Sequence, residues 1–305
     1  MNPEPRVVEV ENARQRARCI KRIRRFFDRR EVIEVFTPVV TETGVTDVHT
    51  ESVPLADGRF LRTSPEYAHK RLLAAGVGDL YELGPVFRAG ERGRRHREEF
   101  LMLEWYRVGW QWAELAEEVL ELVRELTPDT RWTSRRIAWR DLMLQHAGLD
   151  PATASDAELR TVAQDAPEHL DRPALLDWLF ATRLQPALPD GQLTVVHDFP
   201  ACQAALARLK PGEPQWAERF EVFAGSLELA NGYRELTDPV EQRHRFETDN
   251  RRRNELGFRP MPIDHRLIAA LEAGLPECAG VALGVDRLMM IDRGVSDIAE
   301  IRILA

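Results

Sequence analysis

The residues best suited to chemistry lie between Phe87 and Tyr106, where basic and acidic side chains follow one another closely. Arg88 opens this stretch and Glu104 stands near its end. Between them lies a cationic segment that contains Arg92, Arg94, Arg95, His96 and Arg97. Guanidinium groups bind phosphate oxygens in bidentate pairs, and a carboxylate beyond them can hold an ammonium group. The stretch therefore indicates a polyanion site with an amine held nearby, and a solvated charged loop is the alternative.

A second acidic position, Glu66, stands where a helix is predicted to begin. Ser64 can cap that helix, Pro65 suits its first position, and the helix dipole favours a carboxylate in the first turn. The helix should continue through His69 to Gly76. Glu66 is thus either a good first-turn residue or part of a site, and the local pattern leaves both interpretations open.

A third group, Glu221 and Glu228, lies in a predicted hairpin over residues 220–235. A turn at Ala224-Gly225 or at Gly225-Ser226 places both carboxylates on one face, opposed in the first register and diagonal in the second. Their Cβ atoms would then be about 5 to 8 Å apart. A divalent cation would relieve the repulsion, and Mg²⁺ commonly takes one or two protein carboxylates together with phosphate oxygens. The alternative is a solvated sheet face.

A glycine-spaced strand that continues into an apolar helix is predicted over residues 280–291. Glycines in a strand let a ligand approach the backbone closely. Arg287 would stand in the first helical turn, where the dipole disfavours a cation, so we expect it to have another partner. The spacing is not that of a dinucleotide-binding fingerprint, and no βαβ unit surrounds it.

The elements that must position these groups follow from periodicity and turn signals. Alternation flanking the cationic loop predicts two antiparallel strands, with Arg88 at the end of the first and with Glu104 and Tyr106 on one face of the second. A strand over residues 32–40 should end or lie at a sheet edge because Pro38 cannot donate to a ladder. Such an edge is a candidate dimer contact. The remaining predicted elements are a hairpin at Asp57-Gly58, helices over 12–30, 113–126 and 243–253 (the last exposed and charged), and a strand over 193–197.

Two further segments differ in amino-acid composition from the rest of the chain. Residues 1–11 are expected to form a flexible arm before the first helix. Residues 127–190 are rich in alanine, aspartate and proline, and they suggest a small helical insertion. Its short helical patterns cover residues 141–146, 156–164 and 173–184.

Composition limits the classes of protein that the chain can belong to. With 305 residues, of which 44% are hydrophobic, it can form one large domain with an insertion or two domains. A net charge of −8 argues against a protein devoted to non-specific nucleic-acid binding. Cys19, Cys202 and Cys278 lack metal-ligand spacing and are odd in number, which fits a reducing cytoplasm rather than a disulfide framework. Nothing resembles a signal peptide or a membrane span.

Three segments in order resemble motifs one, two and three of class II aminoacyl-tRNA synthetases. They are the strand ending at Pro38, Phe87-Arg88 through Phe100-x-Met-x-Glu104, and Gly284-x-Asp-Arg287. Four motifs narrow the resemblance to the lysyl branch: Thr-Ser-Pro-Glu at 63–66, Met-Leu-Glu-Trp-Tyr at 102–106, Glu-Leu-Ala-Asn-Gly-Tyr-x-Glu-Leu-Thr-Asp at 228–238 and Gly-Val-Ala-Leu-Gly-Val-Asp-Arg at 280–287. Within that branch the chain is most similar to the truncated paralogues that ligate (R)-β-lysine to elongation factor P.

The resemblance implies an α+β fold, with an antiparallel β-sheet flanked by helices, as a class II synthetase-like catalytic domain over residues 12–305. It also implies a homodimer through the first motif and no anticodon-binding domain, since only about ten residues precede the first predicted helix. Family lysyl-tRNA synthetases tend to have alanine where Ser64 stands and glycine where Ala282 stands. Both differences are expected at the amino-acid pocket, where they would reshape it for β-lysine.

The implied activity uses ATP and Mg²⁺ to activate β-lysine or lysine as an acyl-adenylate and passes the acyl group to a lysine of elongation factor P. Arg88 and Arg287 are the implied catalytic residues. The implied amino-acid pocket consists of Ser64, Pro65, Glu66, Glu104, Tyr106, Asn231, Glu235 and Ala282. The implied ATP site consists of Arg88, Ala89, Gly90, His96, Arg97, Phe100, Glu228, Leu229, Gly284 and Arg287. Glu221 and Glu228 are the implied metal ligands.

The cationic loop departs from the family pattern. The chain has Arg88-Ala89-Gly90 where the family usually has Arg-Asn-Glu, and Arg97 where it usually has asparagine. Glu91 could replace the missing glutamate if the loop shifts, and Arg97 could add a phosphate contact. Two alternatives therefore stand beside the ligase: a degenerate synthetase-like regulator, and an adenylating enzyme with another amino acid or acceptor.

Overall fold

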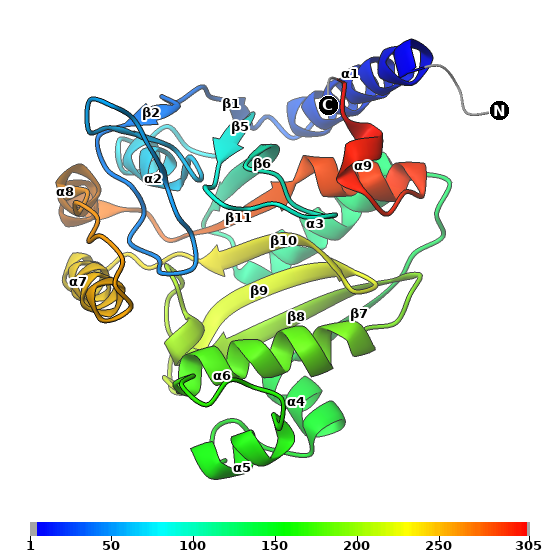
Figure 1. Cartoon of the computed structure of the whole chain (residues 1–305). Coiled ribbons are helices and arrows are strands. Elements are labelled where there is room, and N and C mark those ends of the chain that lie inside the picture. The colour runs from blue at the N-terminus through cyan, green and yellow to red at the C-terminus, as the bar shows by residue number, and fades with distance from the viewer. Residues whose placement is uncertain (1–4, 304–305) are drawn as a thin grey trace.

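The computed structural model describes residues 5–303, and its centre is an eight-stranded sheet (Figure 1). The strands of this sheet are β1 (Ile33–Glu34), β5 (Leu80–Phe87), β6 (Glu99–Val108), β7 (Thr133–Ala138), β8 (Gln192–Pro200), β9 (Trp216–Ala224), β10 (Leu227–Arg234) and β11 (Cys278–Gly284). Their order is β1-β5-β6-β11-β10-β9-β8-β7. All neighbours pair antiparallel except at the two edges, where β1 lies parallel to β5 and β7 to β8. The predicted antiparallel sheet is thus confirmed, with a parallel strand at each edge.

Helices surround this sheet, as the α+β prediction requires. They are α1 (Pro5–Asp28), α2 (Glu66–Ala74), α3 (Trp112–Leu126), α4 (Trp139–Ala147), α5 (Asp156–Val162), α6 (Arg172–Leu179), α7 (Pro239–Glu255), α8 (His265–Gly274) and α9 (Val285–Arg293). Within residues 5–303, no helix is both long and apolar enough to cross a bilayer. A second, three-stranded sheet contains β2 (Val40–Thr41), β4 (Phe60–Leu61) and β3 (Val53–Pro54), which confirms the hairpin predicted at Asp57-Gly58.

The first two predicted elements have different limits in the structure. Helix α1 begins at Pro5, so most of the arm expected over residues 1–11 is helical, and residues 1–4 lie outside the described part of the chain. The strand expected over 32–40 is interrupted, because Thr37 turns its N–H and hydroxyl to the Glu82 carboxylate instead of to a ladder. Only β1 joins the main sheet, and it lies at the edge as predicted.

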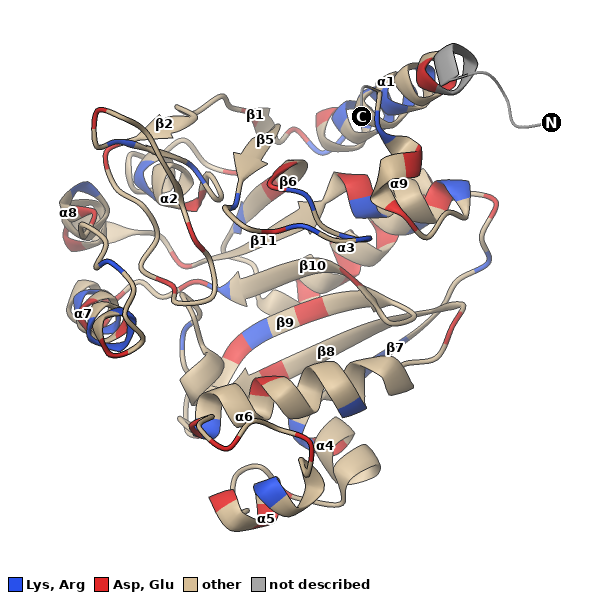
Figure 2. Cartoon of the chain, viewed as in Figure 1, with Lys and Arg blue, Asp and Glu red and all other residues tan. Residues whose placement is uncertain are grey.

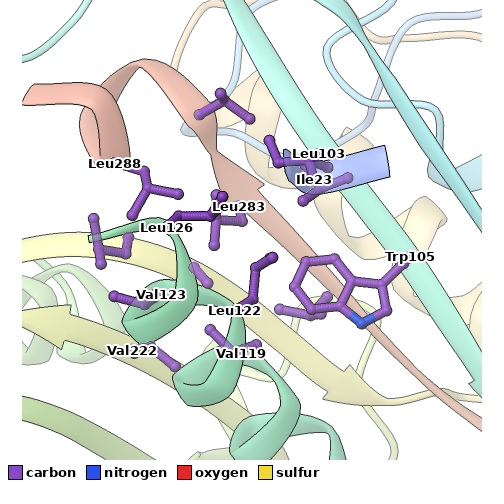
Figure 3. Close-up of a cluster of buried hydrophobic side chains, with 14 of the residues drawn as sticks. Ile23, Leu103, Trp105, Val119, Leu122, Val123, Leu126, Val222, Leu283 and Leu288 are labelled. Carbon is purple, nitrogen blue, oxygen red and sulfur yellow. The ribbon is translucent and has the colours of Figure 1, made fainter. Parts of the chain in front are cut away.

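Helix α3 and the main sheet form the largest part of the hydrophobic core. The sequence predicts this helix from Ala113, and in the structure it begins one residue earlier at Trp112. Figure 3 shows Val119, Leu122 and Val123 of α3 among buried side chains of the strands and of α9. This packing fixes the strands that carry the polar site.

Residues 127–190, predicted as a helical insertion, contain the short helices α4 to α6 and also a strand that sequence reasoning missed. Strand β7 pairs in parallel with β8, from Thr133 opposite Gln192 to Ala138 opposite His197. Its first residues are polar and mostly exposed, so the segment lacks the apolar alternation by which a strand is recognised.

The charged helix predicted over 243–253 is not exposed throughout. Helix α7 buries Gln242, Phe246 and Arg253. Arg253 donates to the carboxylate of Glu51 at 2.7 Å and to the backbone carbonyl of Asp47 at 3.0 Å. Because these acceptors lie on a distant loop, the sequence of the helix alone could not reveal the buried arginine.

Candidate active site

Three buried or partly buried carboxylates from different elements form the centre of the site. Glu66 begins α2, Glu104 lies on β6, and Glu235 directly follows β10. Glu104 and Glu235 are only 2% and 1% exposed. Burial raises the pKa of Glu66 and raises the pKa of Glu235 to about 8. Glu104 Oε2 and Glu235 Oε1 are buried without a hydrogen-bond donor among the described residues, which is costly unless a ligand supplies one.

Lys70, which the sequence analysis did not single out, lies between two of these carboxylates. Its side chain is fully buried. Its Nζ donates to Glu66 Oε1 at 2.8 Å and lies 2.6 Å from Glu235 Oε2, an ionic contact whose angles fall outside those of a hydrogen bond. The i,i+4 spacing of Glu66 and Lys70 on α2 was the signal that could have drawn attention to it.

A buried network behind the carboxylates also went unpredicted. His69 Nε2 lies 3.0 Å from Glu82 Oε2, and its Nδ1 lies 3.4 Å from Glu104 Oε1. Arg62 donates to Glu82 at 2.7 Å. Burial opposes protonation of His69, but its contacts with Glu104 and Glu82 prevail and raise its pKa. Burial likewise opposes ionisation of Glu82, yet His69, Thr37 and Arg62 lower its pKa to about 2.

The sheet register brings together the other residues expected in the amino-acid pocket. The Tyr106 hydroxyl donates to Glu104 Oε1 at 2.9 Å. Ala282 on β11 lies opposite Glu104 on one side and opposite Asn231 on the other. Ser64 Oγ accepts a hydrogen bond of 3.3 Å from the N–H of Glu66. The helix is nevertheless capped at Pro65, one position later than predicted.

Gly280 serves the pocket in a way that differs from the prediction. A Cβ atom at this position would lie 2.3 Å from the Tyr106 ring and 2.4 Å from Glu235 Oε1. The glycine therefore makes room for side chains of the pocket, rather than for a ligand approaching the backbone. A Cβ atom at Gly284, at the end of the same strand, would lie 3.6 Å from the Arg287 side chain, an ordinary contact distance.

The hairpin of β9 and β10 turns at Gly225-Ser226, one of the two predicted turns. An irregularity between Glu228 and Ala230 then shifts the register, so that Glu221 lies opposite Asn231. Neither predicted register therefore extends along the hairpin. Leu229, expected at the ATP site, lies within this irregular segment and is buried in the core. Charged residues interrupt both strands, as Figure 2 shows.

Glu221 and Glu228 still influence each other. Burial raises the pKa of Glu221 to about 7, Arg219 opposes the rise, and the charge of Glu228 adds to it. Arg219 forms an ion pair with Glu221 and donates to Asn231 Oδ1 at 3.3 Å. Among the described residues no three or more metal-ligating side chains cluster. A magnesium ion here would therefore depend on two carboxylates and on substrate oxygens, a donor set that Mg²⁺ accepts.

Arg287 has the other partners that its unfavourable place in α9 predicts. Its Nη1 donates to the Glu228 carbonyl at 2.9 Å and to Glu228 Oε2 at 3.3 Å. Its Nη2 lies 2.7 Å from His96 Nε2. Burial and the charge of Arg287 lower the pKa of His96, which suits a neutral ring that accepts this contact. Nearby, the Arg88 guanidinium lies 5.2 Å from the centre of the Phe100 ring.

The cationic loop between β5 and β6 is held by contacts within itself and with residues of two other segments. Gly90 has a φ of +77°, and its N–H donates to Glu98 Oε1 at 3.0 Å. Arg97 donates to the backbone carbonyls of Gly93 and His96 and lies 3.6 Å from Asp297. Glu91 lies 3.6 Å from Arg88. The phosphate contact suggested for Arg97 and the replacement role suggested for Glu91 remain predictions. Ala89 donates its N–H to the carbonyl of Glu51.

These contacts define two subsites: a cationic one around Arg88, His96 and Arg287, the last just beyond the end of β11, and an acidic one around Glu66, Glu104 and Glu235, the last beside Gly280 of the same strand. The family model for class II tRNA synthetases (D, K and N) matches residues 7–305, and the chain belongs to this family. The resemblance inferred from the three motifs is thereby confirmed.

Curated relatives specify the branch more finely. A Vibrio vulnificus (strain YJ016) protein named elongation factor P–(R)-β-lysine ligase is 46% identical over 307 residues, covering 96% of this chain and 94% of that protein. Proteins of the same name from Pasteurella multocida (strain Pm70) and Histophilus somni (strain 2336) are 45% and 44% identical, with the same coverage.

Proposed function

We propose that the chain uses ATP to activate (R)-β-lysine, or lysine, as an acyl-adenylate and then transfers the acyl group to a lysine side chain of elongation factor P. The observation that carries this proposal is the pair of buried carboxylates, Glu104 and Glu235, each with an oxygen that lacks a donor among residues 5–303. Ammonium groups of a diamino acid would supply those donors. The names of the relatives support the acceptor.

In the first step a substrate carboxylate oxygen attacks the α-phosphorus of ATP, the bond to the bridging oxygen breaks, and pyrophosphate leaves. Arg88 is placed to balance charge on the carboxylate and the α-phosphate, while Phe100 and Arg287 flank the adenine. Glu66 and Glu104 hold one ammonium group, and Tyr106, Asn231 and Glu235 receive the other amine. Tyr106 lies on β6 and Asn231 on β10, with only β11 between these strands, and Glu235 directly follows β10, which supports a shared subsite.

In the second step the ε-amine of the acceptor lysine attacks the acyl carbon, and AMP leaves with the electron pair of the broken bond.

Glu221 and Glu228 would hold Mg²⁺, which when bound would neutralise charge on the phosphate oxygens. The mutual repulsion of these carboxylates and the raised pKa of Glu221 fit residues that receive a cation.

The proposal also includes a homodimer in the cytoplasm. Strand β1 lies at the edge of the main sheet, where Ile33 and Phe36 are exposed. An exposed edge with apolar side chains is suited to pairing with a second copy. Cys19, Cys202 and Cys278 are free thiols, and a reducing compartment keeps thiols in that state.

Amino-acid-dependent exchange of labelled pyrophosphate into ATP tests the adenylation step. We expect exchange with (R)-β-lysine, weaker exchange with lysine, and none without Mg²⁺. Absence of exchange with α-lysine and with both β-lysine enantiomers would contradict the ligase function.

A regulatory, non-catalytic protein is the second candidate. The cationic loop supports this candidate, because Gly90 has no side chain to contact a ligand and because Arg97 donates to backbone carbonyls of the loop itself. Such a protein would bind ATP or the amino acid in calorimetry yet show no pyrophosphate exchange, so the two measurements together separate the candidates.

A further inference from the structure

The fully buried ammonium of Lys70 has no role in the proposed reaction, although it lies inside the amine pocket. A cation is unexpected there, because it carries the same charge as the substrate amines that the pocket would recognise. Its two carboxylate contacts, with Glu66 and Glu235, are both to residues of the proposed substrate site. Lys70 thus acts directly on two of the carboxylates that would accept hydrogen bonds from the substrate amines.

The ionisable groups of the pocket form two contact networks. One joins Glu82 and Glu104 to Arg62 and His69, and the other joins Glu66 and Glu235 to Lys70. When the four carboxylates and His69 all carry their charges, the first network is balanced and the second has one surplus negative charge. Without Lys70 the second network would have two negative charges on largely buried side chains, where uncompensated charge is costly.

We propose that Lys70 is a positioning residue that orients Glu66 and Glu235 and favours their ionised forms, so that the pocket carries one surplus negative charge once both are ionised and then favours an amino acid of net charge +1. This inference rests on the proposed function and deepens it. A diamino monocarboxylate has that net charge, and its complex with the pocket would be neutral overall.

The electrostatics around Lys70 support this role. Burial alone would lower the pKa of Lys70, but Glu235 and Glu66 outweigh burial and raise it, so the ammonium persists across the physiological range. In return Lys70 lowers the pKa of both carboxylates against the effect of burial. Removing the ammonium would therefore raise both carboxylate pKa values and protonate acceptors that the substrate needs.

Among residues 5–303, no cation other than Lys70 forms an ion pair with Glu66 or Glu235. Helix α2 adds His69 and β6 adds Glu104 and Tyr106, while β11 adds Cys278. Tyr106 and Cys278 have pKa values raised by burial, so both stay neutral at physiological pH. Helix α8 packs on α2, but its Asp264 lies 4.0 Å from Arg71 instead.

The test compares Lys70→Met, Lys70→Arg and Arg71→Met with the wild-type chain. Calorimetry measures the Kd of (R)-β-lysine between pH 6.5 and 9, and pyrophosphate exchange measures KM and kcat. Lys70→Met should raise Kd by at least about tenfold at pH 7, the effect of one unit of pKa, and binding should recover toward pH 9 as the acids ionise. KM should change more than kcat.

The other two variants serve as controls. Lys70→Arg keeps the charge and should retain the wild-type pH profile, which also allows the test if Lys70→Met does not fold. Arg71→Met removes the adjacent, half-exposed cation outside the pocket and should leave Kd within about twofold.

The outcomes separate this inference from the proposed function. Wild-type protein that binds neither lysine nor β-lysine would overturn the proposed function. Wild-type binding together with a Lys70→Met variant that is unchanged, or weakened equally at every pH, would overturn the role of Lys70 alone. A Lys70→Arg variant that folds but acquires a new pH dependence would overturn it as well.

Discussion

Glu228 belongs to two interactions at once, since its carboxylate contacts Arg287 and raises the pKa of Glu221. Replacing it with glutamine removes one of two proposed metal-binding carboxylates and keeps the shape of the side chain. We expect Glu228→Gln to reduce Mg²⁺-dependent pyrophosphate exchange by about 100-fold or more, comparable to loss of one preorganised charge-stabilising group. Glu213→Gln, on an exposed loop, is the matched control. Normal exchange in Glu228→Gln would refute the metal assignment.

The raised pKa of Glu221 predicts how stability changes with pH. The folded protein binds this proton more tightly than the unfolded chain, so the associated stabilisation is present below pH 4.5 and is lost as the pH rises through about 7. The Glu221→Gln variant lacks this titrating carboxyl group, so its folded state does not lose that stabilisation as the pH rises. Relative to wild type, the free energy of unfolding of the variant should rise by about 1 to 3 kcal/mol between pH 4.5 and pH 8. Denaturant titrations at both pH values measure it, and a constant difference between the two proteins would contradict the assignment.

Some residues of the candidate site could be predicted from the sequence, and others could not because their roles depend on contacts between distant parts of the chain. Glu104, Tyr106 and Arg287 stand in motifs whose spacing is visible along the chain. The i,i+4 spacing of Glu66 and Lys70 is visible on α2, but the contacts of Lys70 with Glu235 and of His69 with Glu104 are made to other elements, and no local pattern encodes them. The roles carried over from the family remain predictions until the substitutions are measured.

At the scale of elements, α3 fixes the strands that bear the site by packing its apolar side against them. Leu122 is fully buried there, whereas Leu144 on α4 is 42% exposed. Leu122→Ala should lower the free energy of unfolding by about 2 to 5 kcal/mol, because the removed methyl groups leave a cavity. Leu144→Ala, the same change at the surface, should cost less than about 0.5 kcal/mol. Equal losses in denaturant titration would show that α3 does not form the core as described.

Hydrophobic periodicity predicted helices and strands well where one face of the element is buried. It predicted them poorly where pairing with another strand determines whether a strand forms and in which register. The alternation around Glu104 and the apolar stripe of α3 identified their elements to within a residue or two. Strand β7 has no apolar alternation, and the irregularity after Glu228 depends on how β9 and β10 pair. The short strand β1 ends before Thr37, whose N–H and hydroxyl donate to the Glu82 carboxylate of the paired strand β5, a contact that the local sequence does not encode.

At the scale of the whole molecule, the fold class followed from the order of three motifs rather than from periodicity. Hydrophobic patterns indicated strands and helices but could not order eight strands in one sheet. The parallel edges and the missed strand β7 illustrate that limit. Motif resemblance supplied the architecture, because members of a family share topology as well as residues.

The exposed edge of this sheet provides a test of the proposed dimer. Phe36 is 74% exposed beside β1, and Val240 is 76% exposed on α7, away from that edge. Phe36→Glu should convert a dimer to a monomer in sedimentation velocity, since a buried charge would disfavour the interface. Val240→Glu should leave the assembly unchanged. A wild-type chain that is monomeric at all concentrations would contradict the proposed interface.

The central claim is that this chain activates β-lysine and transfers it to elongation factor P. Intact-mass measurement of elongation factor P after incubation with the enzyme, ATP, Mg²⁺ and (R)-β-lysine tests both steps in one experiment. We predict that the acceptor gains the mass of one β-lysyl group, and that omitting ATP or β-lysine prevents the gain. An acceptor of unchanged mass, with an enzyme that is folded and an acceptor bearing its lysine, would contradict the claim.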